Sequence, residues 1–306
     1  MTDTTRKIAE MTLSKKAFDR RRRHRDKKKI LRALLLICFF GVVVLMVTSL
    51  QLGRVKIKEI RVKGNQHYTA EELTLALNVQ VGDPMYGFDT KTASEALISV
   101  CPYLRMVRVE PSLGGVLELV VEERTPLWAL EYQLKDQSLC YVLLDEQLMA
   151  LEHTAQVGDA CLLRVWGIAL PHVGESLIDG AKRAEREYDA WKKEQGTDVA
   201  TPDYSGAASR LADKLRELTG CYPDMTAADA PILLDLTTPY DRFLVVKDGT
   251  CYLLGDAAEL PQLLTKAATA IALYRAEHPE MLPETELLVD LRDASRVLIS
   301  QNRSVK

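Results

Sequence analysis

Residues Pro102–Pro126 read PYLRMVRVEPSLGGVLELVVEERTP, and this stretch decides the fold of the first half of the chain. Apolar residues recur at every second position, at Val107 and Val109 and again at Leu117, Leu119 and Val121. A period of two is typical of a strand with one buried face. Between the two segments, Gly114 and Gly115 can supply the positive φ angles of a tight turn. The stretch therefore predicts a β-hairpin with one apolar face.

A strand and two helices are predicted directly before this hairpin. The alternating segment EIRVK stops at Gly64, where a turn is expected. Thr69 is followed three residues later by Glu72, the spacing of a capping box at a helix start. Asp89 can cap a second helix over about Thr90–Val100. The order strand, helix, helix, strand, strand predicts a small α+β domain over residues 54–125.

Further towards the N-terminus, Ala33–Leu50 reads ALLLICFFGVVVLMVTSL and contains no charged residue. About twenty apolar residues in a helix cross the hydrocarbon core of a bilayer. We predict a single transmembrane helix over residues 33–53. A buried core helix is the alternative, and a signal peptide is another. The long basic flank and the lack of a small-residue cleavage site favour an uncleaved anchor.

Residues 1–32 form a basic tail with thirteen Lys or Arg and four acidic residues. Because basic flanks stay in the cytoplasm, we predict a single-pass type II protein of the cell membrane, with the C-terminal domains outside. A nucleic-acid patch is the weaker interpretation, since basic residues beside a membrane span also attract anionic lipid. The predicted topology and lipid-binding residues are Arg20, Arg21, Arg22, Arg23, Lys27, Lys28, Lys29 and Arg32.

Beyond residue 126 the chain predicts a second mixed α/β domain over residues 126–300, followed by a short tail at 301–306. A charged helical insertion is expected near residues 179–204, and amphipathic helices over Ser205–Leu218 and Glu259–Glu277. The sheet should be mainly antiparallel. Its expected strands are Leu127–Tyr132, Tyr141–Leu144, Leu148–Leu151, Leu162–Ile168, Ile232–Leu236, Phe243–Val246, Cys251–Leu254, Glu286–Leu291 and Arg296–Ser300.

No catalytic, cofactor or metal site is predicted. The chain contains no H-E-x-x-H, G-x-S-x-G or Walker motif. His153 and His172 lack partners at metal-ligand spacing, and the six widely spaced cysteines suggest small buried hydrophobes rather than a disulfide framework. Asp145 and Glu146 indicate a turn rather than a carboxylate pair. The sequence thus predicts a protein that is not an enzyme.

Three segments in this order resemble the FtsQ/DivIB family of bacterial cell division proteins: IRVKGN at Ile60–Asn65, PYLRMVRVEP at Pro102–Pro111 and VEERTP at Val121–Pro126. A later run, DGTCYLLGD at Asp248–Asp256, is similar to the C-terminal half of that family. The resemblance implies a POTRA domain followed by a β-domain, and a scaffold of the division complex at the septum. It implies FtsB/DivIC-like and FtsL-like protein partners and regulation of septal peptidoglycan synthesis, with no nucleic acid and no small-molecule substrate.

The last strand is the expected binding edge, because few residues follow it to cover its unpaired side. The expected mode is strand addition by a partner segment. The candidate partner-binding residues are Val289, Asp290, Leu291, Arg292, Arg296, Val297, Leu298, Ile299 and Ser300. Asp290 and Arg292 should form a local ion pair.

Two other classes compete with this interpretation. A POTRA-bearing secretion or assembly component of the envelope would repeat the POTRA unit or continue into a β-barrel, and the sequence shows neither pattern. A membrane-tethered wall hydrolase would need a catalytic constellation that the motifs above do not supply.

Overall fold

The structure is a computed structural model that describes residues 34–46, 55–87, 89–112, 114–134, 136–227, 229–238, 242–255, 260–282, 285–293 and 296–301. Residues 34–46 are helical, with exposed side chains. Within the described ranges, no helix has both the length and the apolar character needed to cross a bilayer. The predicted anchor at residues 33–53 falls partly outside these ranges, and the basic tail at residues 1–32 falls wholly outside them.

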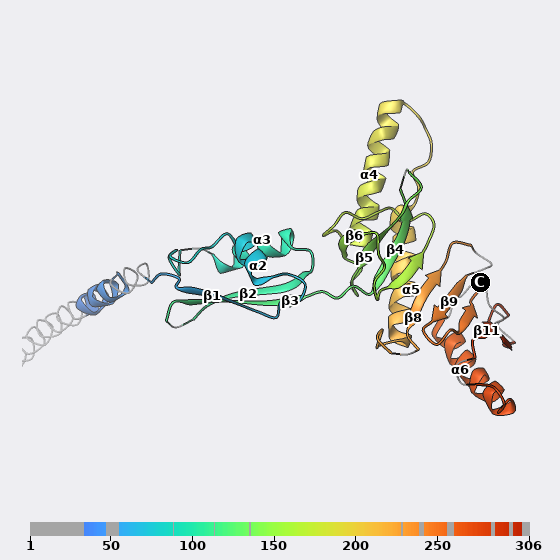
Figure 1. Ribbon diagram of the computed structural model, residues 1–306. Coiled ribbons are helices and arrows are strands. Elements are labelled where there is room, and N and C mark those ends of the chain that lie inside the picture. The colour runs from blue at the N-terminus through green and yellow to red at the C-terminus, as the bar shows by residue number, and fades with distance from the viewer. Residues whose placement is uncertain are drawn as a thin grey trace, which may run out of the picture.

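The first domain contains the elements in the predicted order (Figure 1). Its sheet has the order β1-β3-β2, with β1 parallel to β3 and β2 antiparallel to β3. Leu73 and Leu97 of the helices pack against Leu117 and Leu119 of β3 in one buried cluster. The elements are β1 (Glu59–Lys63), α2 (Ala70–Leu77), α3 (Thr90–Val100), β2 (Leu104–Ser112) and β3 (Val116–Glu123).

Both helix starts of this domain are capped by side chains, as the sequence predicts. The Thr69 hydroxyl accepts a hydrogen bond from the Glu72 N–H at 3.2 Å, and the Glu72 carboxylate accepts one from the Thr69 N–H at 2.8 Å. The Asp89 carboxylate accepts hydrogen bonds from the N–H groups of Lys91 and Thr92 at the start of α3. These bonds satisfy N–H groups that a helix leaves unpaired at its first turn.

The turn between β2 and β3 places both Gly114 and Gly115 at positive φ, +88° and +89°. Gly115 also approaches another segment of backbone, since a Cβ there would lie 2.9 Å from the Lys56 carbonyl oxygen. The Gly115 carbonyl in turn accepts a hydrogen bond from the Lys58 N–H at 2.7 Å. A glycine at position 115 therefore lets the hairpin contact the entry to β1.

The second domain is built on a nine-stranded sheet with the order β12-β11-β10-β9-β8-β7-β4-β5-β6. Most neighbouring strands are antiparallel, but β4/β7, β7/β8 and β10/β11 are parallel. The strands are β4 (Trp128–Gln133), β5 (Leu139–Leu144), β6 (Ala150–Thr154), β7 (Cys161–Arg164), β8 (Pro231–Asp235), β9 (Phe243–Val246), β10 (Cys251–Leu253), β11 (Leu287–Asp290) and β12 (Leu298–Gln301).

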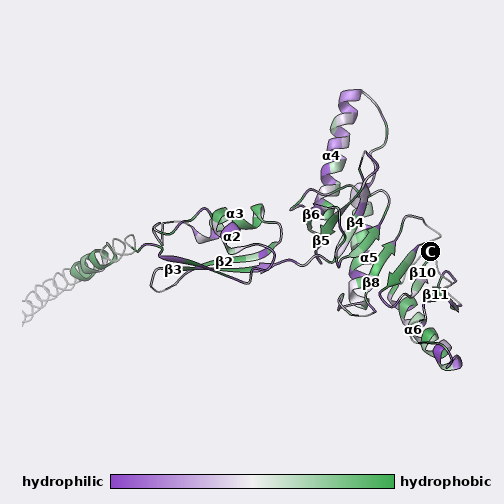
Figure 2. Ribbon diagram, viewed as in Figure 1, coloured by the Kyte–Doolittle hydropathy of each residue, from purple (hydrophilic) through white to green (hydrophobic). Residues whose placement is uncertain are grey.

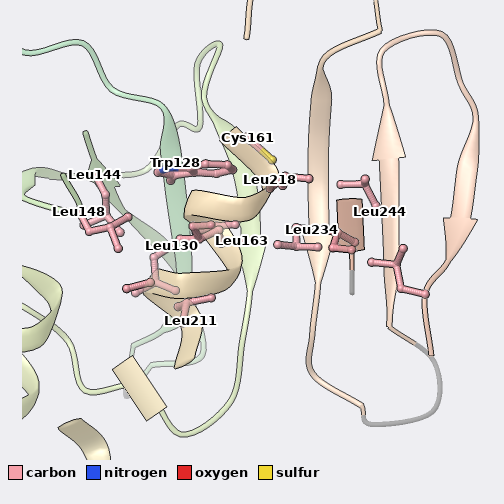
Figure 3. Close-up of a cluster of buried hydrophobic side chains, with 14 of the residues drawn as sticks. Trp128, Leu130, Leu144, Leu148, Cys161, Leu163, Leu211, Leu218, Leu234 and Leu244 are labelled. Atoms are coloured by element: carbon pink, nitrogen blue, oxygen red, sulfur yellow. The ribbon is translucent and has the colours of Figure 1, made fainter. Parts of the chain in front are cut away.

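Helices α4 (Leu177–Gln195), α5 (Tyr204–Cys221) and α6 (Leu260–Glu277) share one core with this sheet. Figure 3 shows Leu211 and Leu218 beside Trp128, Leu130 and Leu163 of the strands. The first turns of α4 are buried through Leu177 and Ala181. The rest of α4 is largely hydrophilic and projects beyond the sheet (Figures 1 and 2).

The two domains meet at the other face of this sheet. Tyr103, at the start of β2, is buried against Ala129, Leu143 and Leu151. The His67 ring stacks on the Tyr103 ring with centroids 3.7 Å apart. The domains are therefore joined by a small apolar contact in addition to the short connecting segment 124–127.

An ion pair fixes the same junction. The Arg124 guanidinium donates to the Asp145 carboxylate, and the two side chains are only 10% and 3% exposed. The Arg124 N–H also donates to the Tyr103 carbonyl at 2.6 Å. The other Asp145 oxygen accepts from the N–H groups of Gln147 and Met149, each at 2.8 Å. Arg124 thus connects the exit of the first domain to a turn of the second.

Candidate partner-binding edge

Strand β12 is the first strand of the nine-stranded sheet, and no strand within the described part of the chain pairs with its outer side. The opposite end of the sheet, β6, differs. There the Ala150 N–H donates to the Glu175 carbonyl and the Ala150 carbonyl accepts from the Gly174 N–H, so its first residue is covered. An uncovered strand edge exposes a row of backbone donors and acceptors. The edge at β12 is the more accessible of the two.

The register of β11 and β12 determines which side chains surround this edge. Val289 pairs with Ile299 and Asp290 pairs with Leu298. Ile299 is half-buried and packs on the domain core, whereas Leu298 is 63% exposed on the other face. The edge therefore offers an apolar side chain on each face, and exposed Ser300 beside Leu298.

The expected ion pair forms next to the edge. The Arg292 Nη2 lies 2.6 Å from the Asp290 Oδ2, and the Arg292 Nε lies 3.0 Å from the Asp290 Oδ1. The hydrogen bonds from the Arg292 side chain lower the pKa of the Asp290 carboxyl. Gly255 makes room for Arg292, since a Cβ at Gly255 would lie 3.0 Å from the Arg292 Cγ.

The structure separates the predicted partner-binding residues into two groups. Val289 and Leu291 are buried, so they support the edge from within the core. Arg296 is exposed just before β12, and Val297 is half-buried on the core. The strand itself runs over Leu298–Gln301, later than the predicted Arg296–Ser300. The predicted topology residues Arg20–Arg32 lie outside the described residues.

Helix α6 lies beside this edge, a neighbour that the sequence did not reveal. Ile271, Tyr274 and Met281 pack on the same core as Val297 and Ile299. Leu273 and Leu282, near the same end of α6, are largely exposed. A strand added to β12 would place its inward side chains on the face that α6 covers.

Two of the described thiols lie in the cores of the domains. Cys101 and Cys161 are buried, and burial raises the pKa of the Cys161 thiol to about 12. Such a thiol stays protonated at neutral pH and is a poor nucleophile. Over the described ranges, no three His, Cys, Asp or Glu side chains are grouped so as to hold a metal ion.

Comparison with known proteins matches part of the chain. Residues 55–124 match the family model of the POTRA domain, FtsQ-type. The chain is 26% identical over 148 residues to a cell division protein DivIB of Clostridium botulinum strain Loch Maree, type A3, and 25% identical to the DivIB of strain Hall, type A. Each alignment covers 48% of this chain and 54% of the relative, so the chain spans about half the length of the curated relatives it matches.

Residues 55–124 are thus similar to an FtsQ-type POTRA domain, and about half of the chain is similar to DivIB proteins. The matched region contains β1 through β3. In the structure, this POTRA-like region is followed by the mixed sheet that ends in β12.

Proposed function

We propose that this chain is a membrane-anchored, non-enzymatic scaffold of the bacterial division complex. Two of its relatives carry the name cell division protein DivIB, and residues 55–124 match an FtsQ-type POTRA domain. The apolar segment at residues 33–53 would anchor the chain, with the basic tail in the cytoplasm and both domains outside. The expected location is the division septum.

The observation that carries the proposal is the uncovered edge at β12. In strand addition, main-chain hydrogen bonds supply affinity and pockets for alternate side chains supply specificity. The β12 edge offers an open backbone, with the apolar side chains of Leu298 and Ile299 on its two faces. The partner of the proposal is a segment of an FtsB/DivIC-like protein, in a complex that includes an FtsL-like protein and regulates septal peptidoglycan synthesis.

Proline substitution along β12 tests this proposal. Proline lacks an N–H, so it removes a ladder hydrogen bond only where that N–H faces the neighbour. The backbone N–H groups of Leu298 and Ser300 point to one side of β12, and that of Ile299 points to the other side. Leu298→Pro and Ser300→Pro therefore test one side, and Ile299→Pro tests the other. The full chain, extracted in mild detergent, is used to recover the host's tagged DivIC-like protein.

We expect the variants that remove an N–H on the outer side of β12 to lose at least about tenfold in partner recovery, while their melting temperature stays near that of the wild type. The variants that remove an N–H facing β11 should weaken the pairing of β12 with β11 and lower the melting temperature. Partner recovery at the wild-type level in folded variants of both kinds would contradict strand addition at this edge. Uniform envelope fluorescence of the tagged chain, instead of a mid-cell band, would contradict the division role itself.

A further inference from the structure

The POTRA domain has an uncovered strand edge of its own. β1 is an end strand of its sheet, and no strand in the described part of the chain pairs with its outer side. The chain just before β1 is covered, because the Ile57 N–H donates to the Asp83 carbonyl and the Ile57 carbonyl accepts from the Gly82 N–H. The open edge therefore consists of the five residues Glu59–Lys63.

A groove of about 610 Å³ runs beside this edge, between β1 and α2. Ile60 contributes to one wall, and Leu75 and Val81 contribute to the other. Leu75 is 81% exposed and Val81 is 64% exposed, which is unusual for large apolar side chains placed together. The helix-covered side of the edge is thus apolar, and nothing described covers it.

The opposite face of β1 is charged, and its charges are balanced. Arg61 pairs with Glu59 at 2.7 Å, and Lys63 pairs with Glu118 of β3 at 3.1 Å. These four groups carry no net charge in one copy of the chain. Two copies of this edge can therefore lie side by side without net charge repulsion.

The residue order of β1, Glu-Ile-Arg-Val-Lys, is complementary to itself. In an antiparallel pair centred on Arg61, Glu59 of one copy lies opposite Lys63 of the other, and Ile60 lies opposite Val62. Directly opposite side chains in an antiparallel pair are close enough to interact, and opposite charges there are stabilising. The two-fold axis would be perpendicular to the sheet, so both α2 helices would lie on the same face.

We propose that β1 is a self-association edge, where two copies of this chain pair antiparallel about Arg61 to form one six-stranded sheet. The contact is isologous, with the same surface used on both copies. Leu75 and Val81 of each copy then flank the joined strands. Five residue pairs form a small interface, so association depends on the high effective concentration of chains held on one membrane.

Disulfide cross-linking at the two-fold axis tests the pairing. Arg61→Cys places two thiols opposite each other at the centre of the proposed interface, at a spacing that a disulfide can bridge. The matched control is Glu110→Cys, on the other edge strand β2 and on the same face of the sheet, since Arg61 and Glu110 both pair with Glu118. Both variants are made in the full chain, reconstituted in lipid vesicles and oxidised alongside the wild type, whose six native cysteines set the background.

We expect at least fivefold more disulfide-linked dimer from Arg61→Cys than from Glu110→Cys or the wild type. Equal cross-linking of the two variants would overturn the proposal, because random collision would then explain the dimers.

A charge exchange tests the register in the Arg61→Cys background. Glu59→Lys alone, or Lys63→Glu alone, places like charges opposite each other and should lower the dimer fraction severalfold. The double exchange restores opposite charges across the axis and should restore most of the dimer. If the double exchange is as weak as the single ones while the melting temperature is unchanged, the proposed register is wrong. The comparison of Arg61→Cys with Glu110→Cys does not include the charge substitutions. It therefore remains a valid test of the pairing even if a charge variant fails to fold.

Discussion

At the residue scale, the ion pair between Asp290 and Arg292 holds the chain where β11 ends. Arg292 donates to Asp290 from its backbone N–H as well as from its side chain. The lowered pKa of Asp290 means that the folded state favours the ionised carboxylate. Such a group stabilises the fold above the pKa that it has in the unfolded chain, and this contribution is lost as the pH falls through its folded pKa.

Asp290→Asn should therefore lower the stability at pH 7 and have no effect at low pH. The pair is partly solvent-exposed, so we expect a loss of less than about 1 kcal/mol at pH 7. The difference between the variant and the wild type should shrink as the pH falls below about 4, the pKa of an unfolded aspartate, and through the lowered folded pKa of Asp290. Urea unfolding of both proteins at several pH values measures this. A difference that does not shrink as the pH falls would mean that the carboxylate charge is not the cause.

Sequence reasoning reached this pair because it is local. Asp290 and Arg292 are two residues apart in an extended segment, so their contact follows from the strand period alone. The same reasoning treated Asp145 only as a turn residue. Its partner, Arg124, is 21 residues away in the chain, and their contact depends on how two domains pack.

At the element scale, the β2–β3 hairpin contains two glycines with nearly equal φ and different surroundings. A Cβ at Gly114 would meet no atom within 4 Å, whereas one at Gly115 would crowd the Lys56 carbonyl. The two positions therefore separate the cost of a positive φ from the cost of close backbone approach.

Gly114→Ala should cost about 1 kcal/mol, because an L-residue is strained at positive φ. Gly115→Ala should lower the free energy of unfolding by about 2–3 kcal/mol in total, because the Lys56 segment must also move to admit the methyl group. Thermal melting of the full chain compares the two variants with the wild type. Equal losses would show that the backbone near Lys56 adjusts without cost.

The elements themselves were largely predictable, and their assembly was not. Caps such as Thr69 and Asp89 mark helix starts locally, so both helices begin where the sequence predicts. The parallel pairs β4/β7 and β7/β8 bring together strands that are distant in the chain, and alternation does not specify strand order. Strand β12 begins at Leu298 rather than Arg296, since Val297 turns into the core before the ladder starts.

At the scale of the whole molecule, Arg124 and Asp145 determine how the two domains meet. Both side chains are nearly inaccessible to water, and Asp145 keeps two backbone donors. Removing one partner of a buried pair leaves the other charge uncompensated. The junction is thus sensitive to a single substitution at Arg124 or Asp145.

Arg124→Met should destabilise the chain by about 3 kcal/mol, the lower end of the range for a broken buried pair, because backbone N–H groups still bond Asp145. The matched control is Arg210→Met, whose pair with Asp203 is exposed on both sides. That control should cost less than about 1 kcal/mol. Thermal melting measures both changes, and small-angle scattering shows whether the domains separate in Arg124→Met. A loss no larger than that of the control would mean that the buried pair does not stabilise the junction.

The buried junction also has a geometric consequence. Besides the short connecting segment 124–127, the packing of Tyr103 and the bonds of Arg124 orient the second domain, and with it β12, relative to the first. If β12 binds a partner as proposed, a substitution at the junction would displace that edge from its partner, even with every residue of β12 unchanged.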